Sequence, residues 1–214
     1  MAAMHPQIVA AAFAVAVIGF VVLSAFAATR NRFEGDLWAT RQMQKLDSEP
    51  VERVIDVTED IGDDPYILLI WIGAGAAFYL PGGWSASALF ALAGAIRMLN
   101  PLLKDLIERP RPPPDLVEVS EFPGTFAFPS GHAASAITVF GLIFYFTHVY
   151  VKHAALRLAV QAACVWMIVV VGIERVYAGE HWPSDVIGGF WYGGMIVCGI
   201  VILHRFLQRR GMAR

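Results

Sequence analysis

Apolar residues are concentrated in six long runs, separated by short turns and by two polar stretches. A helix that crosses a bilayer needs about 20 mostly apolar residues, and each run approaches that length. The runs cover residues 8–28, 65–80, 85–103, 132–150, 156–173 and 186–206. They predict an all-α protein, a bundle of six transmembrane helices. We expect residues 1–214 to form a single integral membrane domain.

The first run, residues 8–28, has two possible interpretations. Small residues at its end, residues 25–28, resemble the cleavage site of a signal peptide. However, the run is longer than the apolar region of a typical signal peptide, and no lysine or arginine precedes it. We therefore expect a retained transmembrane helix.

The two polar stretches, residues 31–64 and 105–128, are acidic on balance. Helix-like apolar spacing at residues 37–46 and 51–61 predicts a short helical segment on the membrane surface. Basic residues collect elsewhere, beside the turn near residue 152 and at the C-terminus. The positive-inside rule then places both termini in the cytoplasm and both polar stretches on the extracytoplasmic side.

Composition agrees with a membrane protein. Hydrophobic residues make up 57% of the chain, charged residues only 16%, and the mean hydropathy is +0.57. Soluble domains have about 25% charged residues. The net charge of −2 gives no indication of a nucleic acid partner. Cys164 and Cys198 lie in apolar runs and fit neither a disulfide framework nor a metal site.

Three polar segments lie where apolar runs meet the outer surface. Any one of them alone has a simpler explanation as a membrane anchor. Together they contain what a phosphoryl group needs, cations and hydrogen-bond donors around its oxygens. Lys104, Arg111 and Arg175 supply positive charge. Ser130 and Gly131 begin an apolar run, where the free N–H groups of a helix start favour an anion.

A nucleophile and a proton donor are also present in these segments. His132 and His181 come from different segments and can take these two roles. Asp185 follows His181 by four residues, one helical turn if a helix begins near Pro183. A carboxylate in that position can hold the imidazole N–H and so fix the tautomer of the histidine.

The three segments resemble the three-part signature of the type-2 phosphatidic acid phosphatase (PAP2) family, membrane branch. The matching residues are Lys104, Arg111 and Pro112, then Pro129–Ser130–Gly131–His132, then Arg175, His181 and Asp185. The six-run layout is similar to that of the membrane members of the family, so the resemblance covers nearly the whole chain.

The resemblance implies an enzyme that needs no metal or other cofactor. His181 would attack phosphorus and carry the phosphate, Asp185 would orient His181, and His132 would protonate the leaving oxygen. The phosphate would be held by Lys104, Arg111, Ser130, Gly131 and Arg175. The implied substrate is a membrane lipid phosphate or pyrophosphate, processed on the extracytoplasmic face, as in bacterial undecaprenyl pyrophosphate and phosphatidylglycerol phosphate phosphatases.

Three residues are not explained by the resemblance. The family motif usually has serine before the arginine of its third part, where this chain has Glu174. Adjacent helical residues face different directions, so we expect Glu174 to point away from the phosphate; facing inward, it would repel the phosphate. Glu180, beside His181, is either a solvated residue or a modifier of the pKa of the histidine. Arg109 duplicates the Arg-Pro pair without the family spacing, so we expect an auxiliary cation.

Three functions remain open at this point. The first is hydrolysis of a lipid phosphate, with undecaprenyl pyrophosphate slightly preferred over phosphatidylglycerol phosphate and phosphatidate. The second is transfer of the phosphoryl group from the same phosphohistidine to another acceptor. The third is a non-catalytic membrane protein that binds phospholipids, against which the set of His132, His181 and Asp185 argues. The pattern does not predict an oligomeric state.

Overall fold

The structure is a computed structural model of the chain, and it describes residues 6–46, 48–49, 53–55, 57–58 and 65–213. These residues form helices and loops without any β-strand, which confirms the all-α prediction. The helices are α1 (Pro6–Ala28), α2 (Asp36–Met43), α4 (Tyr66–Arg97), α5 (Asn100–Ile107), α6 (Gly131–Tyr150), α7 (Ala154–Tyr177) and α8 (Pro183–Arg209).

Within the described residues, five helical segments are long and apolar enough to cross a membrane. They are Ile8–Ala28, Tyr66–Ile107, Gly131–Tyr150, Ala154–Tyr177 and Pro183–Arg209. The second of them, with 42 residues, contains both the second and the third of the six predicted spans. The difference between five and six therefore depends on how this segment is bent.

The backbone of α4 leaves the helical conformation at Gly83, with φ 66° and ψ −166°. A positive φ of this kind is accessible to glycine at little cost, and Pro81 stands two residues before it. The two arms of α4, before and after Gly83, pack against each other. The Nε1–H of Trp71 in the first arm donates to the carbonyl of Phe90 in the second at 3.0 Å. The chain thus reverses at Gly83, and the count of six crossings stays a prediction.

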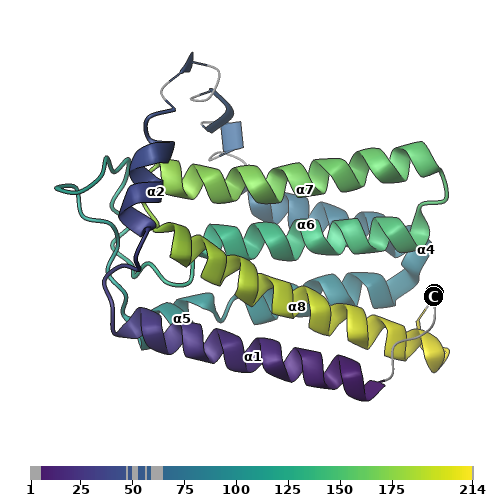
Figure 1. The fold of residues 1–214 in the computed structure, drawn as a ribbon. Helices are drawn as coiled ribbons and strands as arrows, with labels where there is room; N and C mark the ends of the chain where they lie inside the picture. Colours follow the sequence, from purple (N-terminus) through teal and green to yellow (C-terminus); the bar gives the residue numbers. More distant parts are fainter. Residues whose placement is uncertain (1–5, 47, 50–52, 56, 59–64, 214) are drawn as a thin grey trace.

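Helix α6 forms the centre of the bundle, and α4, α7 and α8 pack around it (Figure 1). Helix α1 packs on α8 at the periphery. Large apolar side chains are exposed on the outer faces, for example Val15, Leu80, Leu158 and Trp166. Exposed apolar surface on this scale is unfavourable in water and is suited to lipid.

Two glycines allow α8 to approach α6 closely. A Cβ added to Gly189 would lie 2.5 Å from the carbonyl oxygen of Ser130, and one added to Gly193 would lie 2.6 Å from that of Ala134. Side chains at these positions would push the helices apart. The four-residue spacing of the two glycines in an apolar run indicates close helix packing, and the structure contains it.

The polar segments gather at one end of the bundle. Helix α2 and the loop between α5 and α6 lie there, whereas α1 begins and α8 ends at the opposite end (Figure 1). Helix α2, which overlaps the predicted surface segment 37–46, packs against α7 and α8. The second predicted surface segment, 51–61, lies partly outside the described residues. A position on a membrane surface stays a prediction for both.

Candidate active site

His181 lies in the short connection between α7 and α8 and is only 1% exposed. Its Nδ1 is 3.8 Å from Oδ2 of Asp185, which belongs to the first turn of α8. This distance exceeds a hydrogen bond, and Nδ1 is a buried nitrogen for which the described residues provide no hydrogen-bond partner. Asp185 therefore faces the ring as expected, but at a distance that must shorten before it can hold the imidazole N–H.

The local sequence fixes the position of Asp185. Pro183 starts α8, where the absence of an N–H group costs nothing. Oδ2 of Asp185 accepts the backbone N–H of Trp182 at 2.8 Å, which caps the helix start. The carbonyl of Asp185 accepts the N–H of Ser130 at 3.0 Å. This last bond joins the starts of α8 and α6, and with them two of the three predicted segments.

Arg109 is the main functional candidate whose role the sequence did not predict. Its side chain is buried, and its Nη1 donates to Oδ1 of Asp185 at 2.5 Å and to Oγ of Ser184 at 2.8 Å. Its Nη2 donates to Oδ2 of Asp36 at 3.1 Å. The expected auxiliary cation is therefore a buried partner of Asp185. The only signal in the sequence was the duplicated Arg-Pro pair.

Asp36, at the start of α2, completes this network. Its carboxylate accepts the N–H of Ser184 at 3.0 Å and the hydroxyl of Ser184 at 2.6 Å. It also accepts the N–H of Phe33 at 2.7 Å, which orders the turn before α2. Through these bonds α2 is attached to the start of α8. No motif in the sequence distinguished Asp36 from the other acidic residues of its stretch.

Arg111 and Arg175 converge on Glu180. Nη1 of Arg175 lies 3.1 Å from Oε2 of Glu180, and Nη1 of Arg111 lies 3.6 Å from the same oxygen. Nη1 of Arg111 also donates to the carbonyl of Glu180 at 2.9 Å. Glu180 is 3% exposed, so its interpretation as a solvated residue was wrong. Burial leaves it in contact with the two predicted phosphate-binding arginines.

Glu174 contacts one of these two arginines. It is buried and binds the adjacent guanidinium, with the Nε and Nη2 groups of Arg175 donating to its two oxygens. It thus contacts a predicted phosphate-binding arginine, and its orientation away from the phosphate itself stays a prediction. Successive helical residues do differ in direction, but the long side chain of Arg175 turns back to reach its neighbour.

The remaining predicted residues lie in α5 and at the start of α6. Ser130 is the N-cap of α6, and Nδ1 of His132 lies 3.5 Å from Nη1 of Arg175. Gly131 lies beside Asn100 of α5, since an added Cβ would be 3.2 Å from Oδ1 of that residue. Lys104, one turn further along α5, is close enough for its charge to act on His181.

The electrostatic environment favours a neutral His181. Burial, and then the positive charges of Arg111 and Lys104, hold the pKa of His181 well below its usual value of 6.5. His132 and Arg175 act in the same direction. A neutral imidazole keeps a lone pair on one ring nitrogen, which a nucleophile requires.

The structure thus brings the predicted residues together from α5, the loop after it, α6, α7 and the start of α8. In chemical terms they provide a neutral histidine with an adjacent carboxylate, a second histidine, three cations and a helix N-terminus. No cluster of three or more metal-ligating side chains occurs among the described residues. The arrangement suits attack on a phosphoryl group, and the role of each residue stays a prediction.

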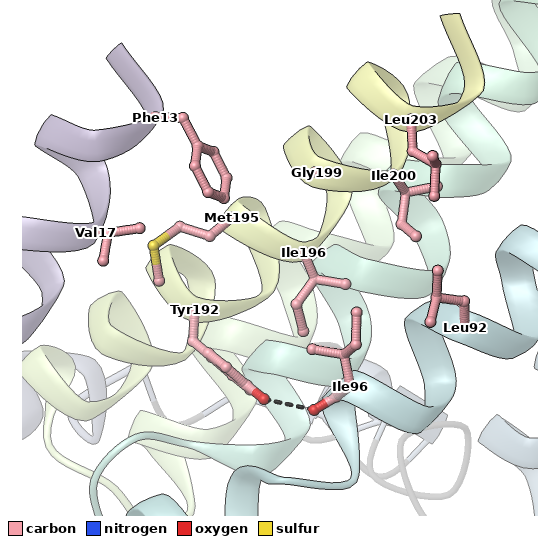
Figure 2. Close-up of a pocket in the computed structure, with 10 residues that line it drawn as sticks. All are labelled: Phe13, Val17, Leu92, Ile96, Tyr192, Met195, Ile196, Gly199, Ile200 and Leu203. Atoms are coloured by element: carbon pink, nitrogen blue, oxygen red, sulfur yellow. Dashed lines mark hydrogen bonds between the residues drawn. The ribbon is translucent and has the colours of Figure 1, made fainter. Parts of the chain in front are cut away.

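An apolar cavity of about 310 Å³ lies between α1, α4 and α8 and opens to the surface of the bundle (Figure 2). Its lining includes Phe13, Leu92, Met195 and Gly199. Tyr192, also in the lining, donates its hydroxyl to the carbonyl of Ile96 at 2.6 Å. Helix α8 connects this cavity with the site, because Asp185 stands two turns before Tyr192.

Comparison with known proteins identifies the family. Residues 82–209 match the PAP2 superfamily. This match covers more than half of the chain and all eight predicted site residues, and it confirms the resemblance seen in the sequence. The chain belongs to the PAP2 superfamily. Asp36, in contrast, lies outside the matched residues.

Two relatives of this PAP2 protein have described activities. Phosphatidylglycerophosphatase B of Bacillus subtilis is 41% identical over 132 residues, which are 59% of this chain and 61% of the relative. Lipid A 1-phosphatase of Rhizobium etli is 33% identical over 121 residues, 52% of this chain and 47% of the relative. The PAP2 protein therefore matches only about half to three-fifths of the length of these relatives.

A solved structure extends the similarity to nearly the whole fold. The crystal structure of a transmembrane PAP2-type phosphatidylglycerolphosphate phosphatase from Bacillus subtilis aligns with a TM-score of 0.78 at 25% identity. The alignment covers 91% of this PAP2 protein and 96% of that chain. A transmembrane neighbour and the five apolar helical segments in the described part of the chain together support an integral membrane protein.

Proposed function

We propose that this PAP2 protein is a membrane lipid phosphatase that works through a phosphohistidine at His181. The observation that carries the proposal is the position of His181, buried beside Asp185 and within the electrostatic influence of Arg111, Lys104, His132 and Arg175. A structural histidine in a membrane protein has no need of such surroundings. A nucleophile that must approach a phosphate needs all of them.

The proposed reaction has two steps. In the first, Nε2 of His181 attacks phosphorus, the bond to the lipid oxygen breaks, and His132 gives its proton to that oxygen. In the second, water attacks phosphorus, His132 takes a proton from the water, and the P–N bond breaks to release inorganic phosphate. Asp185 approaches Nδ1–H in both steps and stabilises the positive charge on the ring.

The phosphate is held by groups from each segment. Lys104, Arg111 and Arg175 balance its charge, and the free N–H groups at the start of α6, near Ser130 and Gly131, point toward its oxygens. These contacts strengthen as charge spreads over the equatorial oxygens in the transition state. They supply this stabilisation without a metal ion.

We propose phosphatidylglycerol phosphate as the first substrate to test, ahead of undecaprenyl pyrophosphate, which the sequence slightly favoured. The relative that is 41% identical and the aligned solved structure both carry names of phosphatidylglycerol phosphate phosphatases. Lipid A should also be tested as a substrate, because the relative that is 33% identical carries the name of a lipid A 1-phosphatase.

The hydrocarbon chain of the substrate is proposed to occupy the apolar cavity between α1, α4 and α8. Its lining is apolar, and it begins about 10 Å from Asp185 along α8. A headgroup at the site and a chain in this cavity would then lie along one helix. We also propose six crossings, both termini in the cytoplasm, the site on the extracytoplasmic face, and residues 1–214 as one domain.

The decisive assay is phosphate release by the purified protein in detergent, with EDTA, from a panel of lipid phosphates. The wild-type protein should release phosphate from at least one lipid, and His181→Ala should not. His148→Ala, an exposed histidine of α6, is the matched control and should keep the activity. A phosphorylated protein that is labile in acid and absent from His181→Ala would identify the intermediate. Activity that survives in His181→Ala, or depends on metal, would refute the proposal.

A further inference from the structure

Glu180 places one carboxylate oxygen between two arginines from separate parts of the chain. Its Oε2 lies 3.1 Å from Nη1 of Arg175 and 3.6 Å from Nη1 of Arg111. Arg175 comes from α7 and Arg111 from the loop that follows α5. Both are the arginines that the family signature assigns to the phosphate, whereas Glu180 belongs to a position that the signature leaves open.

The edge of Arg175 that Glu180 occupies is the edge that faces the catalytic groups. Glu174 binds the other side of the guanidinium, at Nε and Nη2. Nη1 remains, and it points to Glu180 and to Nδ1 of His132, which is 3.5 Å away. A phosphate that reacts between His132 and His181 must reach Arg175 at this same Nη1.

An oxygen shared by two guanidinium groups is also the arrangement that an equatorial phosphoryl oxygen needs. A carboxylate oxygen resembles it in size and charge. We infer that Glu180 holds the place of a phosphate oxygen in the free protein and that a bound phosphate displaces its carboxylate. This inference rests on the proposed function, because it assumes that the phosphate binds at Arg111 and Arg175.

The charges of the site require such a displacement. Arg175 already has two carboxylates in contact, those of Glu174 and Glu180. A phosphate dianion added to both would leave three anions around one buried cation, at a high electrostatic cost. Glu180 can leave more readily than Glu174, because it makes one bond to Arg175 where Glu174 makes two.

The consequence is a selective reduction in affinity for small phosphate ligands. Inorganic phosphate must displace Glu180 using only its contacts with the cations. A lipid phosphate also gains the burial of its hydrocarbon chain, which offsets the displacement. Glu180 therefore acts as a specificity-determining residue that limits inhibition by the product.

Glu180→Gln tests the inference, because glutamine keeps the shape and removes the charge. Inorganic phosphate is the probe, and its affinity is measured twice: by inhibition of lipid hydrolysis and by the rise in melting temperature that it causes, which needs no turnover. Glu180→Gln should bind phosphate about tenfold more tightly or better, a change of about 1.4 kcal/mol. Glu118→Gln removes the same charge from an exposed side chain and should leave the affinity unchanged.

If Glu180 only held Arg111 and Arg175 in position, Glu180→Gln would disorder the two arginines. The affinity for phosphate would then fall instead of rising. Unchanged or weaker binding in Glu180→Gln, with lipid hydrolysis intact in the wild type, refutes the inference and leaves the proposed function standing. If Glu180→Gln does not fold, Glu180→Ala must show the same gain, and its failure to do so counts equally against the inference. A wild-type protein that neither hydrolyses lipid phosphates nor binds phosphate overturns both proposals.

Discussion

Arg109 and Asp185 are 76 positions apart in the sequence, yet Nη1 of Arg109 donates to Oδ1 of Asp185 at 2.5 Å. Both side chains are inaccessible to solvent. The second nitrogen of the guanidinium binds Asp36, so one cation balances two carboxylates. The residue proposed to orient His181 is thus itself held by a residue outside the family signature.

Replacing Arg109 by methionine should destabilise the fold strongly. The substitution keeps much of the side-chain volume but leaves Asp36 and Asp185 buried without their cation. Removing one partner of a buried ion pair typically costs about 3–5 kcal/mol. The free energy of unfolding in detergent, measured with denaturant, tests this. Arg53→Met removes an exposed ion pair with Glu49 and should change little; equal effects of the two substitutions would contradict the buried network.

Substitution of Arg109 or Arg111 by lysine should distinguish the residue that positions Asp185 from the residue that binds the phosphate. A single ammonium cannot span Asp36 and Asp185 as the Arg109 fork does. Arg109→Lys should therefore lower kcat about tenfold or more, a barrier increase of about 1.4 kcal/mol, with little change in KM. Arg111→Lys should mainly raise KM, because Arg111 is proposed to bind the phosphate. Steady-state kinetics with one lipid substrate test both expectations. A raised KM in Arg109→Lys would indicate that Arg109 contacts the substrate instead of positioning Asp185.

The low pKa of His181 predicts a dependence of stability on pH. In the unfolded chain histidine binds a proton near pH 6.5, whereas the folded protein binds one at His181 only at a pH well below that value. The unfolded state therefore binds more protons below pH 6.5, and the contribution of His181 to stability falls as the pH decreases through this value. Unfolding measured between pH 7.5 and 5 should show a shallower loss of stability in His181→Asn, because the slope reflects about one proton that His181 binds in the unfolded state but not in the folded one. Parallel curves for the two proteins would show that His181 is readily protonated in the fold.

The sequence predicted the parts of this site that depend on local pattern. Apolar runs located the helices, and the motif residues from Lys104 to Asp185 lie at the end of the bundle where polar loops gather. The glycine pair Gly189 and Gly193 indicated a close helix contact that the structure contains. Each of these features depends on a spacing or a run of residues that is visible in the sequence.

The charge partners could not be predicted in the same way. Asp36 reaches Ser184 across 148 positions, and nothing in its own stretch distinguishes it from neighbouring acidic residues. Glu174 was expected to point away from the phosphate because adjacent helical residues face different directions, and Glu180 was either a solvated residue or a modifier of the pKa of His181. Both contact Arg175, Glu174 from the neighbouring position in α7 and Glu180 from the turn that follows this helix.

The apolar cavity offers a test of how the lipid chain is bound. Gly199 belongs to its lining, and a Cβ added there would meet no atom within 4 Å. The side chain of a leucine at this position can therefore start without a clash and extend into the cavity of about 310 Å³. If the hydrocarbon chain of the substrate occupies this space, the leucine competes with it.

Gly199→Leu should raise KM for a long-chain lipid phosphate and leave the hydrolysis of a short-chain, water-soluble phosphate ester unchanged. Gly73→Leu is the matched control, because Gly73 is also a helical glycine with open space around its Cβ position but does not line the cavity. Both substitutions favour helix formation equally, so a general effect on stability would appear in both. A raised KM for the long-chain substrate in Gly199→Leu alone would indicate that the hydrocarbon chain binds in the cavity. Equal kinetics on both substrates would mean that the chain lies elsewhere on the bundle, most simply along its exposed apolar surface.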